Sequence, residues 1–413
     1  MIKDKHMIVT RECIEKDINN PEALEITYKN DKKAFSKIIE QMHDEAINSF
    51  AVEFWYARIF RKQKEQKFRY SLKYYGIVIC LIAISWLPVK IYTLDINIDK
   101  GIMLRIIPIA FSFSLSLFFF KNIISMKKIL LTVLPYILLS VYFILLPVNA
   151  TSQSIANAFY FGLIILWFLI WLSFASLKVR EIDLLSEFIQ VTGETIIWST
   201  LFIFGGIVLV FLSINLFETI GIDADKFYVN NIVTLGLCAT PFVSLLVMEK
   251  FDLIKISTIL SKIFLPLFLL SIIGFGIVSL FTDVKPHETR NVFIVYNLML
   301  VVVMCILNFV SINNSNRFIK ICSMVLALVT IALDGVVLSA IIFRIKTYGV
   351  TPNKITLLVA NVIMLANLIY IVFIGLSNRD YKVYSKKILL FLPAYAIFAL
   401  VVVFIFPMMF KFI

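Results

Sequence analysis

Runs of about 20 apolar residues recur along most of this chain, and no other feature restricts its fold so strongly. A helix of that length crosses the hydrocarbon of a bilayer with its backbone hydrogen bonds satisfied internally. Hydrophobic residues make up 60% of the 413 positions and charged residues only 16%, whereas a soluble domain is about 45–50% apolar. The mean hydropathy is +0.92. The sequence therefore predicts an all-α, polytopic integral membrane protein.

Eleven candidate spans follow a polar N-terminal region. We place them near residues 75–94, 102–120, 129–148, 156–177, 195–217, 230–248, 257–281, 291–312, 319–343, 355–376 and 387–410. The chain then has two parts. Residues 1–73 form a small cytoplasmic helical arm with a basic juxtamembrane segment, and residues 74–413 form a transmembrane helical domain of about 11 helices.

The arm carries signals for three short helices. Asn20-Pro21-Glu22 is typical of a helix start, because Asn caps, Pro suits the first helical position and Glu favours the positive end. A second cap is predicted at Asn30-Asp31, and a third helix from about Asn48. The basic run from Arg58 to Lys73 is either a contact with anionic lipid or an ordinary anchor, and both interpretations place the N-terminus in the cytoplasm.

The net charge of +12 does not indicate nucleic acid binding, because the Lys and Arg residues mostly flank apolar runs, as topology determinants do. They are more frequent in loops on the side of the N-terminus than in the alternate loops, so the C-terminus is expected outside. The five cysteines have no CxxC spacing and the three histidines are isolated. No metal site or cofactor is expected, and no motif of soluble enzymes is present.

Asp334 is the sharpest single signal for a site, because it lies inside the ninth span in the segment IALDGVVLS. A charged side chain at mid-bilayer costs at least about 2.5–3.5 kcal/mol. We therefore expect Asp334 to face protein or water, as an ion, proton or substrate site or as a structural acid that pairs with a cation. Lys90 and Arg105 are the candidate partners, since Arg344 is about 15 Å further along the same helix.

The segment after Asp334 carries three cations, Arg344, Lys346 and Lys354, around a Tyr348-Gly349 turn. Thr351 is placed to cap the tenth span, because Pro follows it. The segment is either a helix–loop–helix joint or an anion-binding group on the outer face. Arg344 is expected to be at least half buried and bound to an acceptor. We take Asp334, Arg344, Tyr348, Thr351 and Lys354 as the candidate substrate-binding residues, and the catalytic residues, if any, stay unassigned.

The run from Arg344 to Lys354 resembles a signature of the bacterial multi-pass membrane family catalogued as domain of unknown function 4153. The start of the fifth span at Gly193-Glu194-Thr195 and the arm segments PEALEITYKNDKKAF and EFWYARI are similar to that family as well. Lys354 departs from the Arg expected there. The resemblance implies a protein of the bacterial cytoplasmic (inner) membrane and no particular activity. Independently of the family, Glu194 is expected to complement the N-terminal end of its helix.

These observations leave three hypotheses for function. A permease or flippase-like transporter of a small or amphipathic substrate is favoured by the many helices, the in-span prolines and the buried acid. A membrane-embedded enzyme that acts on lipid-linked substrates is the first alternative. A non-catalytic membrane subunit, whose arm recruits a cytoplasmic protein partner, is the second. Membrane lipids are expected partners in each case, and a small-molecule or lipid-like substrate in the first two.

Overall fold

The protein separates into two compact units, Met1–Tyr75 and Gly76–Ile413, which are described here one at a time. The computed structural model describes residues 10–18, 20–44, 50–56, 72–94, 99–119, 126–147, 151–219, 222–251, 265–274, 276–277, 290–313, 317–377 and 381–412. The basic run predicted to lie next to the membrane falls mainly on residues 57–71, outside this part of the chain.

The N-terminal unit contains four short helices: α1 (Arg11–Lys16), α2 (Pro21–Asn30), α3 (Lys32–Asp44) and α4 (Phe50–Tyr56). Both predicted caps are confirmed, because the Asn20 side chain accepts a hydrogen bond from the Ala23 amide at 3.3 Å and Asp31 accepts one from the Ala34 amide at 3.0 Å. The helices enclose a core of their own, formed by Ile14, Leu24, Phe35, Ile39, Met42, Val52 and Trp55.

The second unit is built from long apolar helices. These are α5 (Leu72–Thr93), α6 (Lys100–Phe119), α7 (Met126–Leu145), α8 (Gln153–Phe174), α9 (Ile182–Thr219), α10 (Asp225–Phe227), α11 (Thr234–Phe251), α13 (Arg290–Asn313), α14 (Arg317–Tyr348), α15 (Pro352–Ser377), α16 (Tyr381–Leu389), α17 (Leu392–Leu400) and α18 (Phe406–Met409). π-helical turns at Tyr228–Val233 and Val401–Ile405 join α10 to α11 and α17 to α18. Ten helical segments of the described chain are long and apolar enough to cross a membrane, which makes the protein an all-α, multi-pass membrane protein.

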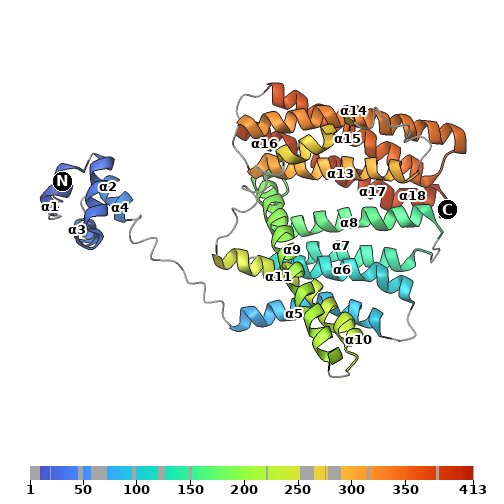
Figure 1. Ribbon diagram of the computed structural model, residues 1–413, viewed down its shortest axis with the longest axis horizontal. Coiled ribbons are helices and arrows are strands. Elements are labelled where there is room, and N and C mark those ends of the chain that lie inside the picture. Colours follow the sequence, from blue (N-terminus) through green and yellow to red (C-terminus); the bar gives the residue numbers. More distant parts are fainter. Residues whose placement is uncertain are drawn as a thin grey trace. The chain divides into compact units, whose positions relative to one another are not determined.

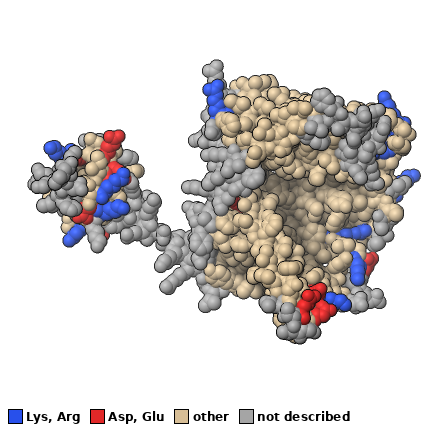
Figure 2. Space-filling model, in the orientation of Figure 1, with Lys and Arg blue, Asp and Glu red and all other residues tan. Residues whose placement is uncertain are grey.

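Most of these helices lie roughly alongside one another, and α9 crosses them at a steep angle (Figure 1). The space-filling view shows a broad surface without charge over the membrane unit, with Lys and Arg side chains gathered towards the ends of the helices (Figure 2). This is the distribution that a bilayer requires, because charged groups are costly in hydrocarbon and stable in the interfacial regions.

Two predicted spans differ from the structure. The seventh, near 257–281, falls largely outside the described residues, which contain only a shorter apolar helix at Leu265–Gly274. The fifth begins earlier than predicted, because α9 starts at Ile182 and not near Thr195. Glu194 is therefore fully buried well inside α9. The prediction that it complements the N-terminal end of a helix is wrong, since that effect is confined to the first turn.

The largest core of the membrane unit lies among α13, α14, α15 and α16. Leu300, Leu307, Leu326, Val337 and Leu368 have no exposed surface there. Small residues allow close helix approach on the inward faces, as at Ala327 and Ala340 of α14, which are also fully buried. Asp334 lies in the middle of α14 and points into this core, so the packing of apolar helices positions the one acid that the sequence singled out.

Candidate functional site

Asp334 is fully buried, with an exposed fraction of 0%. Neither of its carboxyl oxygens accepts a hydrogen bond from any described residue. Thr330, one turn away on the same face of α14, is also fully buried, but its hydroxyl donates to the Leu326 carbonyl at 2.7 Å and not to Asp334. An unpaired carboxylate is costly in such surroundings, so this site favours a bound proton or a ligand that donates hydrogen bonds.

A polar pair joins α15, which packs against α14, to α17. Asn367 of α15 donates a hydrogen bond from Nδ2 to the Tyr395 hydroxyl of α17 at 3.0 Å. The Asn367 carbonyl oxygen is buried and accepts no hydrogen bond from the described part of the chain. The Asn367–Tyr395 hydrogen bond joins α15 to α17 inside the membrane unit.

A further amide pair joins α15 to α13. Asn361 of α15 donates from Nδ2 to the Asn297 side-chain oxygen of α13 at 2.9 Å and to the Leu357 carbonyl at 2.7 Å. Its own carbonyl oxygen, like that of Asn367, is buried without a described donor. All the unsatisfied atoms of Asp334, Asn361 and Asn367 are hydrogen-bond acceptors. The Tyr395 hydroxyl accepts from Asn367 and keeps its own O–H as a donor.

The two cations predicted to pair with Asp334 do not reach it. Lys90 donates to the Asn231 side chain from the C-terminal end of α5. Arg105 donates to the backbone carbonyls of Phe143, Leu146 and Pro147 at 2.9, 2.7 and 2.9 Å. Each therefore binds acceptors at helix ends of the α5–α7 region, and the prediction that they neutralise Asp334 is wrong.

Arg344 is more than half buried, as expected, and its guanidinium lies 4.7 Å from the centre of the Phe293 ring. This is a cation–π contact with α13, the neighbouring helix. Arg344 is ten residues beyond Asp334 in α14, which corresponds to about 15 Å along the helix. The contact with Phe293 thus joins the C-terminal part of α14 to α13 and is separate from the buried acid.

The turn that follows is a well-defined joint between α14 and α15. Gly349 has a φ of +74°, which only glycine adopts easily. Thr351 accepts a hydrogen bond from the Lys354 amide at 3.4 Å, the predicted cap. The Lys354 ammonium donates to the Gly349 carbonyl at 2.7 Å and lies 5.6 Å from the centre of the exposed Tyr348 ring. These contacts account for Tyr348, Thr351 and Lys354 without a ligand.

The five candidate residues therefore do not form one site. Asp334 is separated from Tyr348 by fourteen residues of α14, about 21 Å along its axis. The structure instead shows a polar pair, Asn367 and Tyr395, between α15 and α17. Asn367 can be recognised in the sequence as a polar residue within the tenth predicted span, whereas one tyrosine in an apolar helix carries no pattern that separates it from packing residues.

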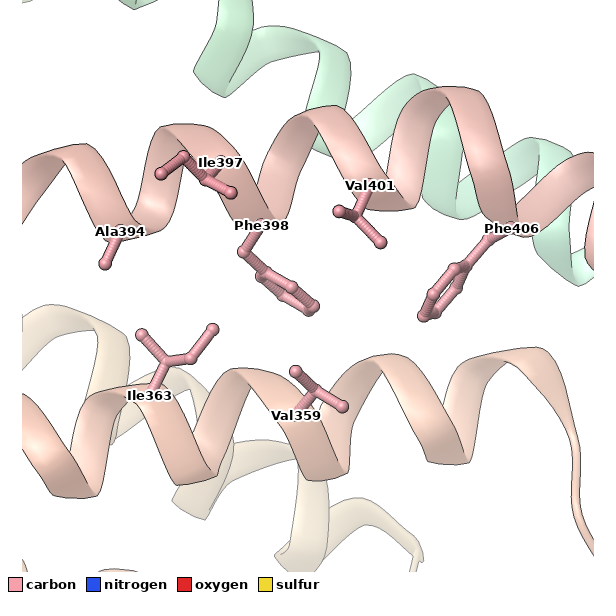
Figure 3. A pocket seen from close by; sticks show the side chains of 7 residues that line it. All are labelled: Val359, Ile363, Ala394, Ile397, Phe398, Val401 and Phe406. Atoms are coloured by element: carbon pink, nitrogen blue, oxygen red, sulfur yellow. The ribbon is translucent and has the colours of Figure 1, made fainter.

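An apolar groove lies between α15 and the last helices of the chain (Figure 3). Its volume is about 390 Å³, and it is lined by Val359, Ile363, Ala394, Ile397, Phe398, Val401 and Phe406. Figure 3 shows Ala394 and Ile363 towards one end of the groove and Phe406 at the other, with the Phe398 and Phe406 rings directed between the helices. Nothing in the sequence pattern indicated this groove.

Groups of three or more His, Cys, Asp or Glu side chains that could hold a metal ion do not occur in the part of the chain that the structure describes. No family model, curated protein or solved structure matches the chain. The resemblance to the family of domain of unknown function 4153 accordingly stays a prediction, and function has to be argued from the geometry alone.

Proposed function

We propose that this protein is a permease or flippase-like transporter of a small or amphipathic substrate, with Asp334 as the group that binds a proton or cation during transport. One observation carries the proposal: a carboxyl group at the middle of a membrane helix is fully buried and has no hydrogen-bond donor among the described residues. A structural acid would be expected to pair with a cation, and the predicted cations have other partners. A carboxyl group that binds and releases a proton or a ligand is expected to have no permanent ion-pair partner.

The proposed setting is a bacterial cytoplasmic membrane, with the N-terminal unit in the cytoplasm. The excess of Lys and Arg in alternate loops supports this orientation. Neither an enzyme acting on lipid-linked substrates nor a recruiting subunit gains comparable support. Two of the three cations predicted to bind an anion have partners within the protein: Lys354 takes part in the joint between α14 and α15, and Arg344 contacts Phe293.

Transport requires that the middle of the membrane be reached by water from each side in turn. The test replaces the five native cysteines by alanine and introduces Thr330→Cys, one turn from Asp334. A charged, membrane-impermeant methanethiosulfonate reagent is applied to whole cells and, separately, to inside-out vesicles. We expect labelling from both sides.

Leu307→Cys is the control, because Leu307 is equally buried but lies in the apolar core of α13. If the cysteine at position 330 reacts no faster than the control, the site is dry and Asp334 is structural. Reaction from one side alone would mean that water reaches the site from that side and not from the other, and would also contradict transport.

A further inference from the structure

The apolar groove runs parallel to α15 on one side and to α17 and α18 on the other (Figure 3). On α15 its lining includes Val359, about two helical turns, or about 10 Å, from the first residue of the helix, Pro352. On the other side it includes Phe406, the first residue of α18, which ends at Met409. Pro352 and Met409 are also where the two candidate membrane spans end. One end of the groove therefore lies near the end of both spans.

The surroundings of the groove indicate that hydrocarbon fills it. Every side chain of its lining is apolar, and a water molecule needs polar partners in order to stay in a cavity. The groove is open to the surface of the membrane unit, because Ile397 in its wall is 63% exposed. In a bilayer this surface meets lipid. Because membrane helices are tilted by only about 20° on average, a groove parallel to them has roughly the direction of the lipid chains.

Two lysines adjoin the Phe406 end of the groove. The Phe410 ring lies 5.7 Å from the Phe406 ring, centre to centre, and Lys411 follows Phe410. Ile355 packs against the same hydrophobic cluster, and Lys354 precedes Ile355. Each lysine is thus the chain neighbour of a residue in the cluster around Phe406.

The protein provides no acidic partner for these two charges among the described residues. Lys411 is exposed and forms no ion pair with the described part of the chain. The contacts of Lys354 are with a carbonyl and a tyrosine ring, both uncharged. Downstream of Asp334 the sequence contains one acidic residue, Asp380, and it follows the C-terminal end of α15, the opposite end from Lys354. An anion from outside the protein is therefore expected to supply the counter-charge.

We propose that the groove binds one acyl chain of an anionic phospholipid, with the phosphate at the Phe406 end, where Lys354 and Lys411 supply positive charge. Such a lipid carries its apolar and charged groups in the order in which the protein presents their partners. Lysine offers the phosphate a point charge and N–H donors. The site is separate from Asp334, so this inference goes beyond the proposed transport function and does not depend on it.

The headgroup is tested by native mass spectrometry of the purified full-length protein, titrated with dioleoylphosphatidylglycerol or dioleoylphosphatidylcholine. The two lipids have the same chains and differ in net charge. We expect saturable binding of the phosphatidylglycerol and binding of the phosphatidylcholine at least about fivefold weaker, since each lysine near an anionic lipid contributes about that factor.

Lys411→Gln tests the position of the phosphate, because it removes one charge and no contact of the described chain. We expect binding of the phosphatidylglycerol to weaken by about fivefold. Lys346→Gln is the matched control. Lys346 is exposed in the last turn of α14, at the same end of the α14–α15 pair, and does not line the groove. Its replacement should leave the affinity unchanged.

The position of the acyl chain is tested by Ile397→Trp, which adds bulk at a lining position that is largely exposed and so should not disturb folding. Ile405→Trp is the control, because Ile405 is 52% exposed on the same stretch of chain and does not line the groove. We expect binding about fivefold weaker in the first variant, since the indole displaces part of the chain, and no change in the second.

Equal affinity for the two lipids would overturn the anionic headgroup. An equal loss in Lys411→Gln and Lys346→Gln would overturn the placement of the phosphate, and native affinity in Ile397→Trp would overturn the placement of the chain. Glycerol 3-phosphate carries the phosphate without an acyl chain. Competition from it at the same concentration as the lipid would show that the lysines bind phosphate without the groove, and the proposal would fail.

Discussion

At the scale of single residues, Gly193 shows how tightly α9 is held against α13. A Cβ atom built on Gly193 would lie 1.9 Å from Cε2 of Phe309, which is closer than any real contact. We expect Gly193→Ala to destabilise the protein by about 1–3 kcal/mol, the usual cost of overpacking a core. Thermal unfolding of the purified protein, followed by tryptophan fluorescence, measures the change.

Gly205 provides the control for this prediction, because it lies in the same helix and has nothing within 4 Å of its Cβ position. Gly205→Ala should be neutral or stabilising by up to about 1 kcal/mol, since alanine favours helix. A second change, Phe309→Leu, should restore part of the stability lost by Gly193→Ala. If Gly193→Ala unfolds at the same temperature as the native protein, the close packing of α9 on α13 is wrong.

The sequence predicted single residues well where the signal is local. Thr351 caps its helix and Gly349 adopts a positive φ, because both follow from the chemistry of one turn. Asp334 was recognisable because a charged side chain within a membrane span has a high free-energy cost unless it faces protein or water. Its surroundings were not predictable, because they depend on how several helices pack, and the sequence offered Lys90 and Arg105 on charge alone.

At the scale of elements, Arg105 fastens the C-terminal end of α7 to α6. The last carbonyls of a helix have no hydrogen-bond partner within it. The Arg105 guanidinium donates to the carbonyl of Phe143 in the last turn of α7 and to the carbonyls of Leu146 and Pro147 just after it, at 2.7–2.9 Å. We expect Arg105→Gln to lower the free energy of unfolding by about 1.5–3 kcal/mol, the range for hydrogen bonds to charged groups. Arg105→Lys should recover part of this, because it keeps the charge and loses the planar fork.

Lys100 supplies the control for Arg105, since it begins the same helix and its side chain is exposed. Lys100→Gln should leave the unfolding temperature within error. An equal loss of stability in Arg105→Gln and Lys100→Gln would mean that positive charge at this end of the unit stabilises the protein and that the three carbonyl contacts do not.

The positions of most spans followed from hydropathy, because the length of an apolar run is set by the bilayer itself. The ninth and tenth spans were predicted near 319–343 and 355–376, and α14 and α15 include both. The start of α9 was missed since its first turns are partly polar. Leu185, Phe188 and Ile189 are nevertheless buried there, and their spacing of three and four residues is the helical signal that could have revealed it.

At the scale of the whole molecule, the orientation in the membrane is the main untested prediction. We expect reporter fusions to show a cytoplasmic N-terminus and an external C-terminus. The reason is that Lys and Arg are more frequent in the loops on the side of the N-terminus than in the alternate loops. An alkaline phosphatase fused after Ile413 should be active and one fused before Met1 inactive, with the reverse pattern for a fluorescent protein that matures only in the cytoplasm. The opposite pattern at both ends would invert the proposed topology.

The contacts of α9 have a consequence for how often the chain crosses the membrane. Thr195 and Ser199 of α9 contact Met248 and Ser244 of α11, at 3.9 and 3.0 Å, so the two helices are antiparallel and the end of α11 lies beside α9 near Gly193. Phe309 places the end of α13 at that same level, against Gly193. Helices that end on one face must both have begun on the other. The chain therefore leaves α11 at Phe251 on one face and enters α13 at Arg290 on the other. This is the arrangement that the seventh predicted span, near 257–281, requires, and the described apolar helix Leu265–Gly274 falls within that span.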